Sequence, residues 1–291
     1  MFSFRSETKD LNDETRRWTG GSFVALSDGV THYELSNSTS ENTVVLVHGF
    51  SVPYFIFDPT FRFLSQHGFR VLRYDLFGRG FSDRPDTEYN IDLFERQLSE
   101  LLDALQFTRP VSLVGLSMGG PITATFTARH PERVNKIVWI DPAGARSLSF
   151  ARLLRFAAKP KIGEFLLNMV GTGKFTRSFA AKFVTKDLDR NFQKQYFVQL
   201  QFRGTRNAIL STVRNHMLEP FLDTYRQVGK LNKRVLLIWG REDTLVLLSQ
   251  SVDIFGSIPN VEFHIIEEAS HIPHYEKPEE TNPLLLQFLS K

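Results

Sequence analysis

Residues 115 to 119, G-L-S-M-G, place a serine between two glycines at a spacing that suits nucleophilic catalysis. The motif follows the apolar run Val111 to Leu116, which is typical of a buried parallel strand, and it precedes a segment with helical character. A sharp turn from strand to helix presses neighbouring backbones together, so Gly115 and Gly119 occupy positions with little room for a Cβ. Such a turn holds the Ser117 hydroxyl at the carboxyl edge of a sheet, beside a helix N-terminus that favours negative charge. We therefore predict that Ser117 is a nucleophile.

A serine hydroxyl is a weak nucleophile, so it needs a base that is itself held by a third group. In a strand–turn–helix arrangement of this kind the partners follow in the order serine, acid, histidine. His271 comes shortly after the apolar run Val261 to Ile266, and a short turn there would direct it back over the sheet. His274, three residues later, is the competing base, and we expect it to be a surface histidine or a support for His271.

The acid is expected just after the preceding strand, Arg234 to Trp239, where G-R-E-D supplies it. Asp243 is predicted to accept the imidazole Nδ1–H and fix the tautomer of the base. Glu242 is the neighbouring alternative. Asp141 is a further candidate, because it follows the strand after the serine motif, but a cap on the turn before Pro142 explains it more simply.

A tetrahedral intermediate requires two backbone N–H donors. Met118, immediately after the serine, is predicted to supply one, and Phe50 in His48-Gly49-Phe50 is predicted to supply the other. His48 is expected to support this loop and not to act as a base.

Several other polar residues receive a structural interpretation. Asp75 and Arg79 lie in a loop after a strand, where turn-stabilising hydrogen bonds explain them without contact to a substrate. The G-R-G at residues 78 to 80 lacks the third glycine of a dinucleotide fingerprint and does not open a helix, which argues against a nucleotide site. Three histidines have no metal-ligand spacing, so no catalytic metal is predicted: His32, His216 and His264.

The surrounding pattern alternates strands and helices, which predicts a mostly parallel sheet with right-handed crossovers. A hairpin is expected at the start, with strands Ser22 to Leu26 and Val30 to Leu35. Between residues 144 and 230 the alternation stops and only helical patches remain, which indicates a helical insertion, or lid. The predicted organisation is a core of residues 1–143 and 231–291 with a lid of residues 144–230.

Composition narrows the class of protein. The 291 residues are 42% hydrophobic and include no cysteine, so disulfides, thiol nucleophiles and cysteine-bound zinc are excluded. The first residues lack the apolar segment of a signal peptide, and no run approaches the roughly 20 apolar residues of a spanning helix. These features favour a cytoplasmic location. The oligomeric state is not indicated.

Six segments, taken together, resemble the α/β-hydrolase superfamily in its serine esterase- and lipase-like branch. They are V-V-L-V-H-G-F, R-Y-D-L-F-G-R-G-F-S-D, V-G-L-S-M-G-G, W-I-D-P-A-G, W-G-R-E-D-T-L-V and A-S-H-I-P-H-Y-E-K-P-E-E. The resemblance covers almost the whole chain outside the lid. It implies an eight-stranded, mostly parallel sheet, a lid after the sixth strand, no cofactor, and a triad of Ser117, Asp243 and His271.

Carboxylic ester hydrolysis through an acyl-enzyme is the activity we expect from this resemblance. Epoxide hydrolases and haloalkane dehalogenases of this fold carry an aspartate at the position of Ser117, which argues against both. Carbon–carbon bond hydrolases typically have a glycine-rich oxyanion loop, unlike H-G-F-S-V-P here. They remain an alternative, as do cofactor-free perhydrolases, which share the H-G-F start, and non-catalytic binding proteins of this fold.

The lid is strongly basic, with 16 lysines and arginines against 5 aspartates and glutamates between residues 144 and 230. Ten of the 27 phenylalanines also lie in it. A solvated basic face over a packed apolar face accounts for this pattern. A sharper hypothesis is transient contact with anionic lipid, because basic amphipathic helices favour such surfaces. Nucleic-acid binding is not expected, since no recognition motif accompanies the charge.

Overall fold

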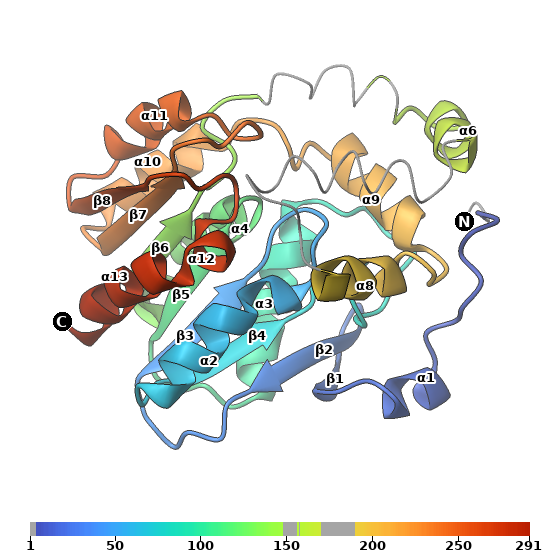
Figure 1. Ribbon diagram of the computed structural model, residues 1–291, viewed down its shortest axis with the longest axis horizontal. Coiled ribbons are helices and arrows are strands. Elements are labelled where there is room, and N and C mark those ends of the chain that lie inside the picture. Colours follow the sequence, from blue (N-terminus) through green and yellow to red (C-terminus); the bar gives the residue numbers. More distant parts are fainter. Residues whose placement is uncertain (1–3, 148–155, 157, 170–189) are drawn as a thin grey trace.

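Eight strands form a single sheet in a computed structural model that describes residues 4–147, 156, 158–169 and 190–291 (Figure 1). The strand order is β1-β2-β4-β3-β5-β6-β7-β8. The strands are β1 (Ser22–Leu26), β2 (Gly29–Leu35), β3 (Thr43–Val47), β4 (Arg70–Tyr74), β5 (Val111–Leu116), β6 (Val134–Ile140), β7 (Arg234–Gly240) and β8 (Val261–Ile266). Pairing from β4 through β3 to β8 is parallel, and only β1 with β2 and β2 with β4 pair antiparallel. The expected hairpin and the expected mostly parallel sheet are confirmed.

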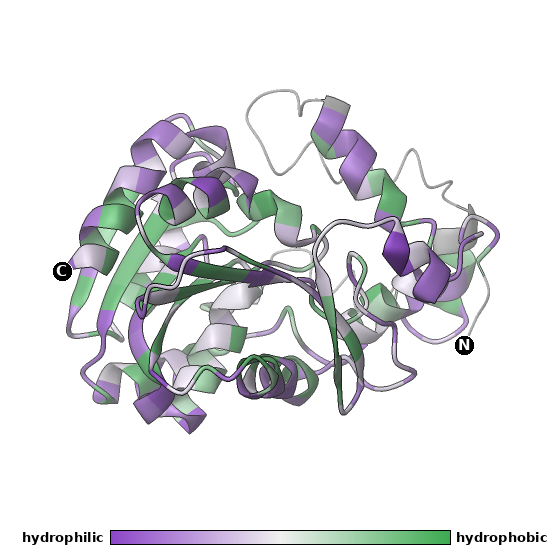
Figure 2. Ribbon diagram, turned by 90° about the horizontal axis from the view of Figure 1, so that it is seen from below, coloured by the Kyte–Doolittle hydropathy of each residue, from purple (hydrophilic) through white to green (hydrophobic). Residues whose placement is uncertain are grey.

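Helices cover both faces of the sheet, as parallel strands require (Figure 2). The helices of the core are α1 (Asp13–Arg17), α2 (Asp58–Gln66), α3 (Ile91–Ala104), α4 (Gly119–Arg129), α10 (Leu222–Lys230), α11 (Ser251–Phe255), α12 (Pro273–Glu276) and α13 (Pro278–Ser290). Short 3₁₀ turns η1 (Tyr54–Phe57), η2 (Pro131–Arg133) and η3 (Leu248–Gln250) complete this part. Helices α2, α12 and α13 pack together in front of the sheet in Figure 1, while α3 and α10 both pack on α4.

Strand burial explains why the sequence reads as continuous apolar runs. Every residue of β3 and β5 is buried, because both of their faces are covered by helices. Helix α3 shows the one-sided pattern instead, with Asn90 capping its N-terminus by accepting a hydrogen bond from the Leu93 amide at 3.0 Å. Its buried face includes Leu98 and Leu101, at the helical spacing that the sequence predicted.

Three further helices lie between β6 and β7 within the described residues: α6 (Ile162–Met169), α8 (Arg190–Gln199) and α9 (Thr205–Arg214). Arg214 of α9 donates to the Ala158 carbonyl at 2.6 Å and to Glu164 of α6 at 2.7 Å, which ties α6 to α9. A helical insertion after the sixth strand is therefore present. Residues 148–155, 157 and 170–189 of the predicted lid lie outside the described residues.

The boundaries predicted for the lid, residues 144 and 230, stay a prediction. Helix α10 lies inside these limits but packs on the core helix α4, and the Tyr225 hydroxyl of α10 donates to the Ala143 carbonyl at 2.7 Å. This packing favours an insertion that ends before α10. None of the described helices is long and apolar enough to cross a membrane.

Candidate active site

Ser117 stands at the turn between β5 and α4 in a backbone conformation that few residues other than glycine adopt, with φ of 53°. Its amide donates to the Ile140 carbonyl at 3.0 Å, and its carbonyl accepts from the Gly120 and Ala143 amides at 2.8 and 3.0 Å. The bonds with Ile140 and Ala143 hold the strained turn against the end of β6, and the bond with Gly120 closes the turn itself. These hydrogen bonds keep the strained backbone conformation of Ser117 in place. Strained backbone of this kind is common at functional sites.

The two glycines of the motif are required by close contacts, as the sequence predicted. A Cβ on Gly115 would lie 2.5 Å from the Gly119 carbonyl oxygen, and a Cβ on Gly119 would lie 2.2 Å from the Val47 carbonyl oxygen. Real Cβ atoms do not approach other atoms so closely, so β3, β5 and α4 meet here without space for a side chain.

The loop after β3 lies directly beside the serine. A Cβ on Gly49 would be 3.0 Å from the Cβ and 3.5 Å from the Oγ of Ser117. Phe50 and Met118, the two expected oxyanion donors, therefore belong to segments that adjoin Ser117. Their catalytic role stays a prediction.

His48 fixes the orientation of the peptide group that carries the Phe50 amide. Its Nε2 accepts a hydrogen bond from the Leu76 amide at 2.9 Å, so the proton of the neutral ring is on Nδ1. Nδ1 then donates to the Gly49 carbonyl at 2.9 Å. The Gly49 carbonyl and the Phe50 N–H belong to the same planar peptide and point in opposite directions, so this bond sets the direction of the Phe50 N–H. Burial lowers the pKa of His48 to about 4, which keeps the ring neutral.

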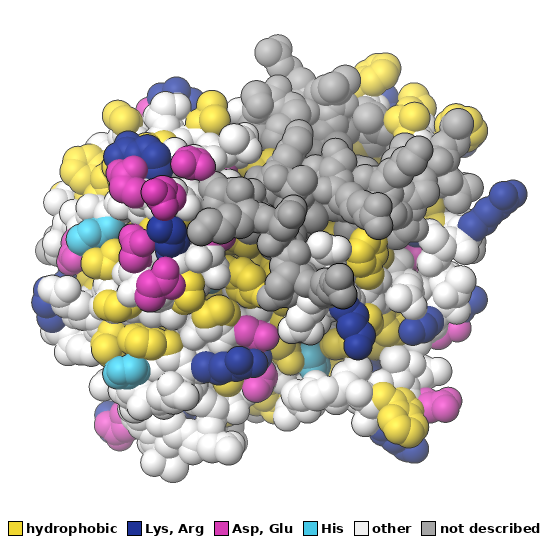
Figure 3. Space-filling view, viewed as in Figure 1, with side chains coloured by type: hydrophobic (Ala, Val, Ile, Leu, Met, Phe, Trp, Pro, Cys, Tyr) yellow, Lys and Arg dark blue, Asp and Glu magenta, His cyan; other side chains and the backbone are white. Residues whose placement is uncertain are grey.

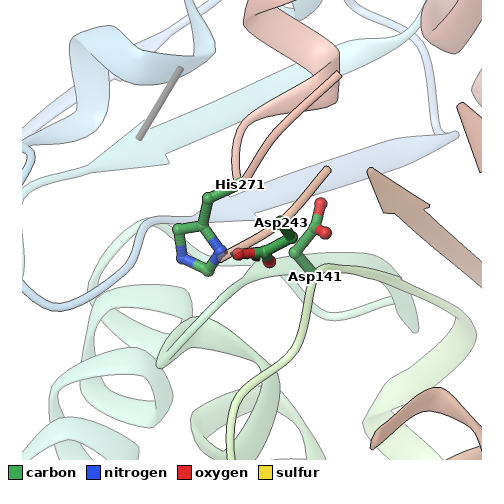
Figure 4. A group of neighbouring side chains, drawn as sticks. All are labelled: Asp141, Asp243 and His271. Carbon is green, nitrogen blue, oxygen red and sulfur yellow. Dashed lines mark hydrogen bonds and ion pairs between the residues drawn. The ribbon is translucent and has the colours of Figure 1, made fainter. Parts of the chain in front are cut away.

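Asp243 and His271, the residues expected as acid and base, are in direct contact. His271 Nδ1 lies 2.7 Å from Asp243 Oδ2, and both side chains are almost completely buried (Figure 4). The other carboxylate oxygen, Oδ1, accepts from the Leu245 and Val246 amides at 2.7 and 2.9 Å. The carboxylate is held by the loop after β7 and receives the imidazole N–H that fixes the tautomer of the base. Glu242 is exposed, which removes it as the acid in this arrangement.

The structure corrects the expectation for Asp141. It does not cap the turn at Pro142; its Oδ1 accepts from the Gly240 amide at 2.9 Å, and its side chain lies beside Asp243, on the side away from His271 (Figure 4). One ligand atom from each of these three residues lies within 4.8 Å of the other two. Burial, followed by the charge of Asp243, raises the pKa of Asp141 well above its usual value.

His274 is buried and not a surface residue. Its ring packs against Phe57 with centroids 4.8 Å apart, and neither ring nitrogen has a hydrogen-bond partner among the described residues. Burial, with a smaller contribution from His271, lowers its pKa to about 3. His274 is thus a neutral packing residue beside the candidate base, and the preference for His271 agrees with the geometry.

Asp75 and Arg79 make the loop-stabilising hydrogen bonds that the sequence suggested. Asp75 accepts from the Tyr54 and Phe81 amides, each at 2.9 Å, and from His32 at 2.7 Å. Burial alone would raise the pKa of Asp75, but the hydrogen bond and the charge of His32 bring it below its usual value.

Arg79 supports the loop beside Ser117, which the sequence did not reveal. Its Nε donates to the Phe50 carbonyl at 2.8 Å, and one terminal nitrogen donates to Thr212 of α9 at 2.8 Å. The side chain is fully buried, and burial lowers its pKa to about 9. Nothing in the local sequence predicts this link, because Phe50, Arg79 and Thr212 come from three separate parts of the chain.

The site thus lies at the carboxyl ends of consecutive parallel strands, where Ser117 follows β5, Asp141 follows β6, Asp243 follows β7 and His271 follows β8. Asp141, Asp243 and His271 could supply three ligand atoms to a metal ion, but the His271 Nδ1 and an Asp243 oxygen are already joined by a hydrogen bond. The expectation that the site uses neither metal nor cofactor stays a prediction.

Residues 42–278 match the alpha/beta hydrolase fold family, and the chain belongs to this family. Among curated proteins, it is 30% identical over 284 residues to 2-hydroxy-6-oxononadienedioate/2-hydroxy-6-oxononatrienedioate hydrolase 1 of Pseudomonas putida, covering 92% of this chain and 96% of the relative. The hydrolase of the same name from Escherichia coli strain K12 is 28% identical over 262 residues, 86% of this chain and 88% of the relative.

Solved structures agree on the fold. The enol-lactonase of Burkholderia xenovorans LB400 aligns with a TM-score of 0.76 at 20% identity, covering 93% of this chain and 100% of that one. The haloalkane dehalogenase DatA of Agrobacterium tumefaciens C58 aligns with a TM-score of 0.80 at 24% identity, covering 93% of this chain and 96% of that one. At these identities the likeness establishes the fold alone, and the chain is a hydrolase of the α/β-hydrolase family.

Proposed function

We propose that this protein is a serine hydrolase that cleaves a carbon–carbon bond next to a ketone, in an acid of the 2-hydroxy-6-oxo-dienoate type. The observation that carries the chemistry is the buried Asp243–His271 hydrogen bond at the sheet edge that also bears Ser117. The choice of bond is supported by relatives of up to 30% identity over nearly the whole chain that are named for such substrates. Carbon–carbon cleavage, an alternative among the expectations from the sequence, is therefore favoured over carboxylic ester hydrolysis.

In the proposed reaction, His271 takes the proton of Ser117 as the oxygen adds to the ketone carbon. The Phe50 and Met118 amides hold the resulting oxyanion, and Asp243 stabilises the imidazolium. The substrate reacts as its keto tautomer, in which the proton of the 2-hydroxyl group has moved to the carbon next to the ketone. Collapse then breaks the bond between this carbon and the ketone carbon, and the electron pair leaves as a dienolate that takes the proton from His271. Water then cleaves the acyl-enzyme with the same base, which releases a carboxylic acid and restores Ser117.

Ester cleavage is the second candidate, because the loop beside Ser117 is poor in glycine. Phe50 follows Gly49 directly, and the buried Arg79 holds the Phe50 carbonyl and also lies 5.7 Å from the Phe50 ring. A loop fixed in this way leaves less freedom than a glycine-rich one for a bulky substrate carbonyl. The same triad cleaves an ester by the same steps, with an alcohol in place of the enolate as leaving group.

One experiment separates these functions. A 2-hydroxy-6-oxo-dienoate and p-nitrophenyl esters of several chain lengths are offered to the wild type and to Ser117→Ala, and the loss of the conjugated chromophore or the release of nitrophenolate is followed. Turnover of the dienoate that exceeds the esters in kcat/KM by about tenfold or more and disappears in Ser117→Ala supports carbon–carbon cleavage. Serine-dependent ester turnover without dienoate cleavage establishes the second candidate instead.

A non-catalytic protein of this fold gives a third outcome. A serine-directed organophosphonate would then fail to label the wild type, and neither substrate would be turned over in a Ser117-dependent way. Cofactor-free perhydrolysis is tested in the same assay by adding peroxide and measuring peracid. Labelling that is lost in Ser117→Ala establishes a nucleophilic serine whichever substrate is used.

A further inference from the structure

We propose that Asp141 is a positioning residue that carries a proton at neutral pH and holds the Asp243 carboxylate toward His271 as a neutral hydrogen-bond donor. The inference rests on the proposed roles of Asp243 and His271. In this proposal the site contains two carboxyl groups, of which Asp243 is ionised and Asp141 is protonated.

The two carboxyl groups are too close and too deeply buried for both to be ionised. Asp141 is 0% exposed and Asp243 is 4% exposed. An oxygen of each lies within 4.8 Å of the other and of a His271 nitrogen. Two like charges at this separation in a medium of low dielectric constant repel strongly, so one group of such a pair retains its proton.

The hydrogen bonds decide which group is charged. Asp243 receives three: two from the Leu245 and Val246 amides and one from His271. Asp141 receives one, from the Gly240 amide at its Oδ1. Donors stabilise the ionised form of a carboxyl group, so the negative charge belongs on Asp243 and the proton on Asp141.

The second oxygen of Asp141 is consistent with this assignment. Asp141 Oδ2 is buried and has no hydrogen-bond partner of ordinary geometry among the described residues. An ionised oxygen in that position would lack the donors that a buried negative charge needs, whereas a protonated one brings its own donor. The neighbouring acceptor is the Asp243 carboxylate, whose charge also raises the pKa of Asp141.

Other titratable groups around the pair leave the assignment unchanged. Glu276 of α12 accepts from the Ser270 amide at 2.9 Å, and its charge also raises the pKa of Asp141. His274, on the same helix, stays neutral because its pKa is lowered to about 3. Tyr225 of α10 also stays neutral, because burial raises its pKa well above the usual value.

The backbone conformation at Asp141 allows the residue to be replaced by asparagine or glycine without added strain. Asp141 has a φ of 42°, a left-handed conformation that aspartate and asparagine tolerate better than most residues and that glycine adopts without strain. Asp141→Asn therefore keeps the shape, the backbone conformation and a donor, while it fixes the group as neutral. Asp141→Gly keeps the backbone conformation and removes the group.

The deciding measurement is the pH titration of the His271 imidazole, followed by NMR in the wild type and in Asp141→Asn. A neutral Asp141 predicts midpoints that agree within about 0.3 pH units, since no charge is removed. An ionised Asp141 predicts that the variant lowers the pKa of His271 by about one unit or more, and this result would overturn the proposal. The titration does not need turnover, so it gives an answer even if the proposed hydrolase activity fails.

The positioning role has its own test, in whichever hydrolysis assay is active. Asp141→Asn is expected to keep kcat within about threefold of the wild type, while Asp141→Gly lowers kcat by about tenfold or more with little change in KM. Thermal unfolding of both variants checks that they are folded. A folded Asp141→Gly with wild-type kcat would show that Asp141 does not position Asp243.

Discussion

The carboxyl edge of the sheet and helix α6 of the insertion differ in how far their side chains are exposed. At the sheet edge, Asp243 and His271 are 4% and 2% exposed and joined by a hydrogen bond. On α6, Phe165 is 61% exposed, and Figure 3 shows hydrophobic side chains gathered over this helix. The first region is fixed by its bonding partners, whereas the second presents apolar surface outward.

The two regions are therefore suited to different roles. A buried, bonded site holds its groups in one geometry, as transition-state stabilisation requires. An exposed apolar helix beside exposed lysines, such as Lys159 and Lys161, suits contact with something outside the protein. Substitutions in the two regions test this contrast, and the largest effects are expected at the sheet edge.

Asp243→Asn is expected to have the largest effect. The amide would offer His271 a donor where it needs an acceptor, so kcat should fall by about 10⁴-fold while the fold is retained. Steady-state kinetics with circular dichroism measures both. Glu242→Gln, an exposed neighbour, is the matched control and should stay within about twofold of the wild type. An active Asp243→Asn would contradict the role of Asp243 as the acid and would leave Asp141 as the candidate.

His48→Ala is expected to lower kcat by up to about 10²–10³-fold, with a smaller effect on KM, because the peptide that presents the Phe50 amide loses its anchor. His48→Asn keeps a donor for the Gly49 carbonyl and should recover part of the rate. Equal losses in both variants would indicate a packing role for His48 and not an orienting one.

Acid sensitivity should also originate at the sheet edge. His48 and His274 are neutral in the fold, with pKa values of about 4 and 3, and both return to a value near 6.5 on unfolding. The unfolded state therefore binds more protons than the folded state below pH 6.5. For each histidine, the free energy of unfolding decreases by about 1.4 kcal/mol for each unit by which the pH is lowered.

His274→Leu removes one of these two contributions. The loss of unfolding free energy between pH 7 and pH 5, measured by urea titration, should shrink by about 2 kcal/mol in this variant. At pH 7 the leucine should be tolerated, because neither ring nitrogen of His274 has a described hydrogen-bond partner. An unchanged pH dependence would show that His274 already carries its proton in the folded protein at pH 5.

The smallest effect on stability is expected on α6. Phe165→Gln should change the free energy of unfolding by about 0.5 kcal/mol or less. If the basic lid contacts anionic lipid, as the sequence suggested, the variant should nevertheless bind phosphatidylglycerol vesicles more weakly in a flotation assay. Val252→Gln on α11 is the control, since Val252 is 66% exposed but lies outside the insertion. Equal binding by both variants and the wild type would argue against a lipid-facing lid.

Local sequence was enough for much of the fold because its signals are local. Two-sided burial makes β3 and β5 continuous apolar runs, and the spacing of Leu98 and Leu101 in α3 is set by one helix. The turn at Ser117 was predictable for the same reason. Gly115 and Gly119 are required because a Cβ there would clash with atoms within a few residues of the serine or in the neighbouring strand. The lid was less predictable, because α10 is amphipathic whether it packs on α4 or elsewhere.

The sequence by itself determined the order of the strands along the chain and the turn that carries Ser117, and it singled out Asp243 and His271, which the structure joins by a hydrogen bond. Only the tertiary structure decided what surrounds them: Asp141 lies beside Asp243, His48 is hydrogen-bonded to Leu76 and Gly49, and Arg79 joins Phe50 to Thr212. The physical reason is distance along the chain. A motif records contacts between neighbouring residues, whereas the charge state of Asp141 depends on a carboxylate about a hundred residues away that reaches it only when β6 and β7 pair.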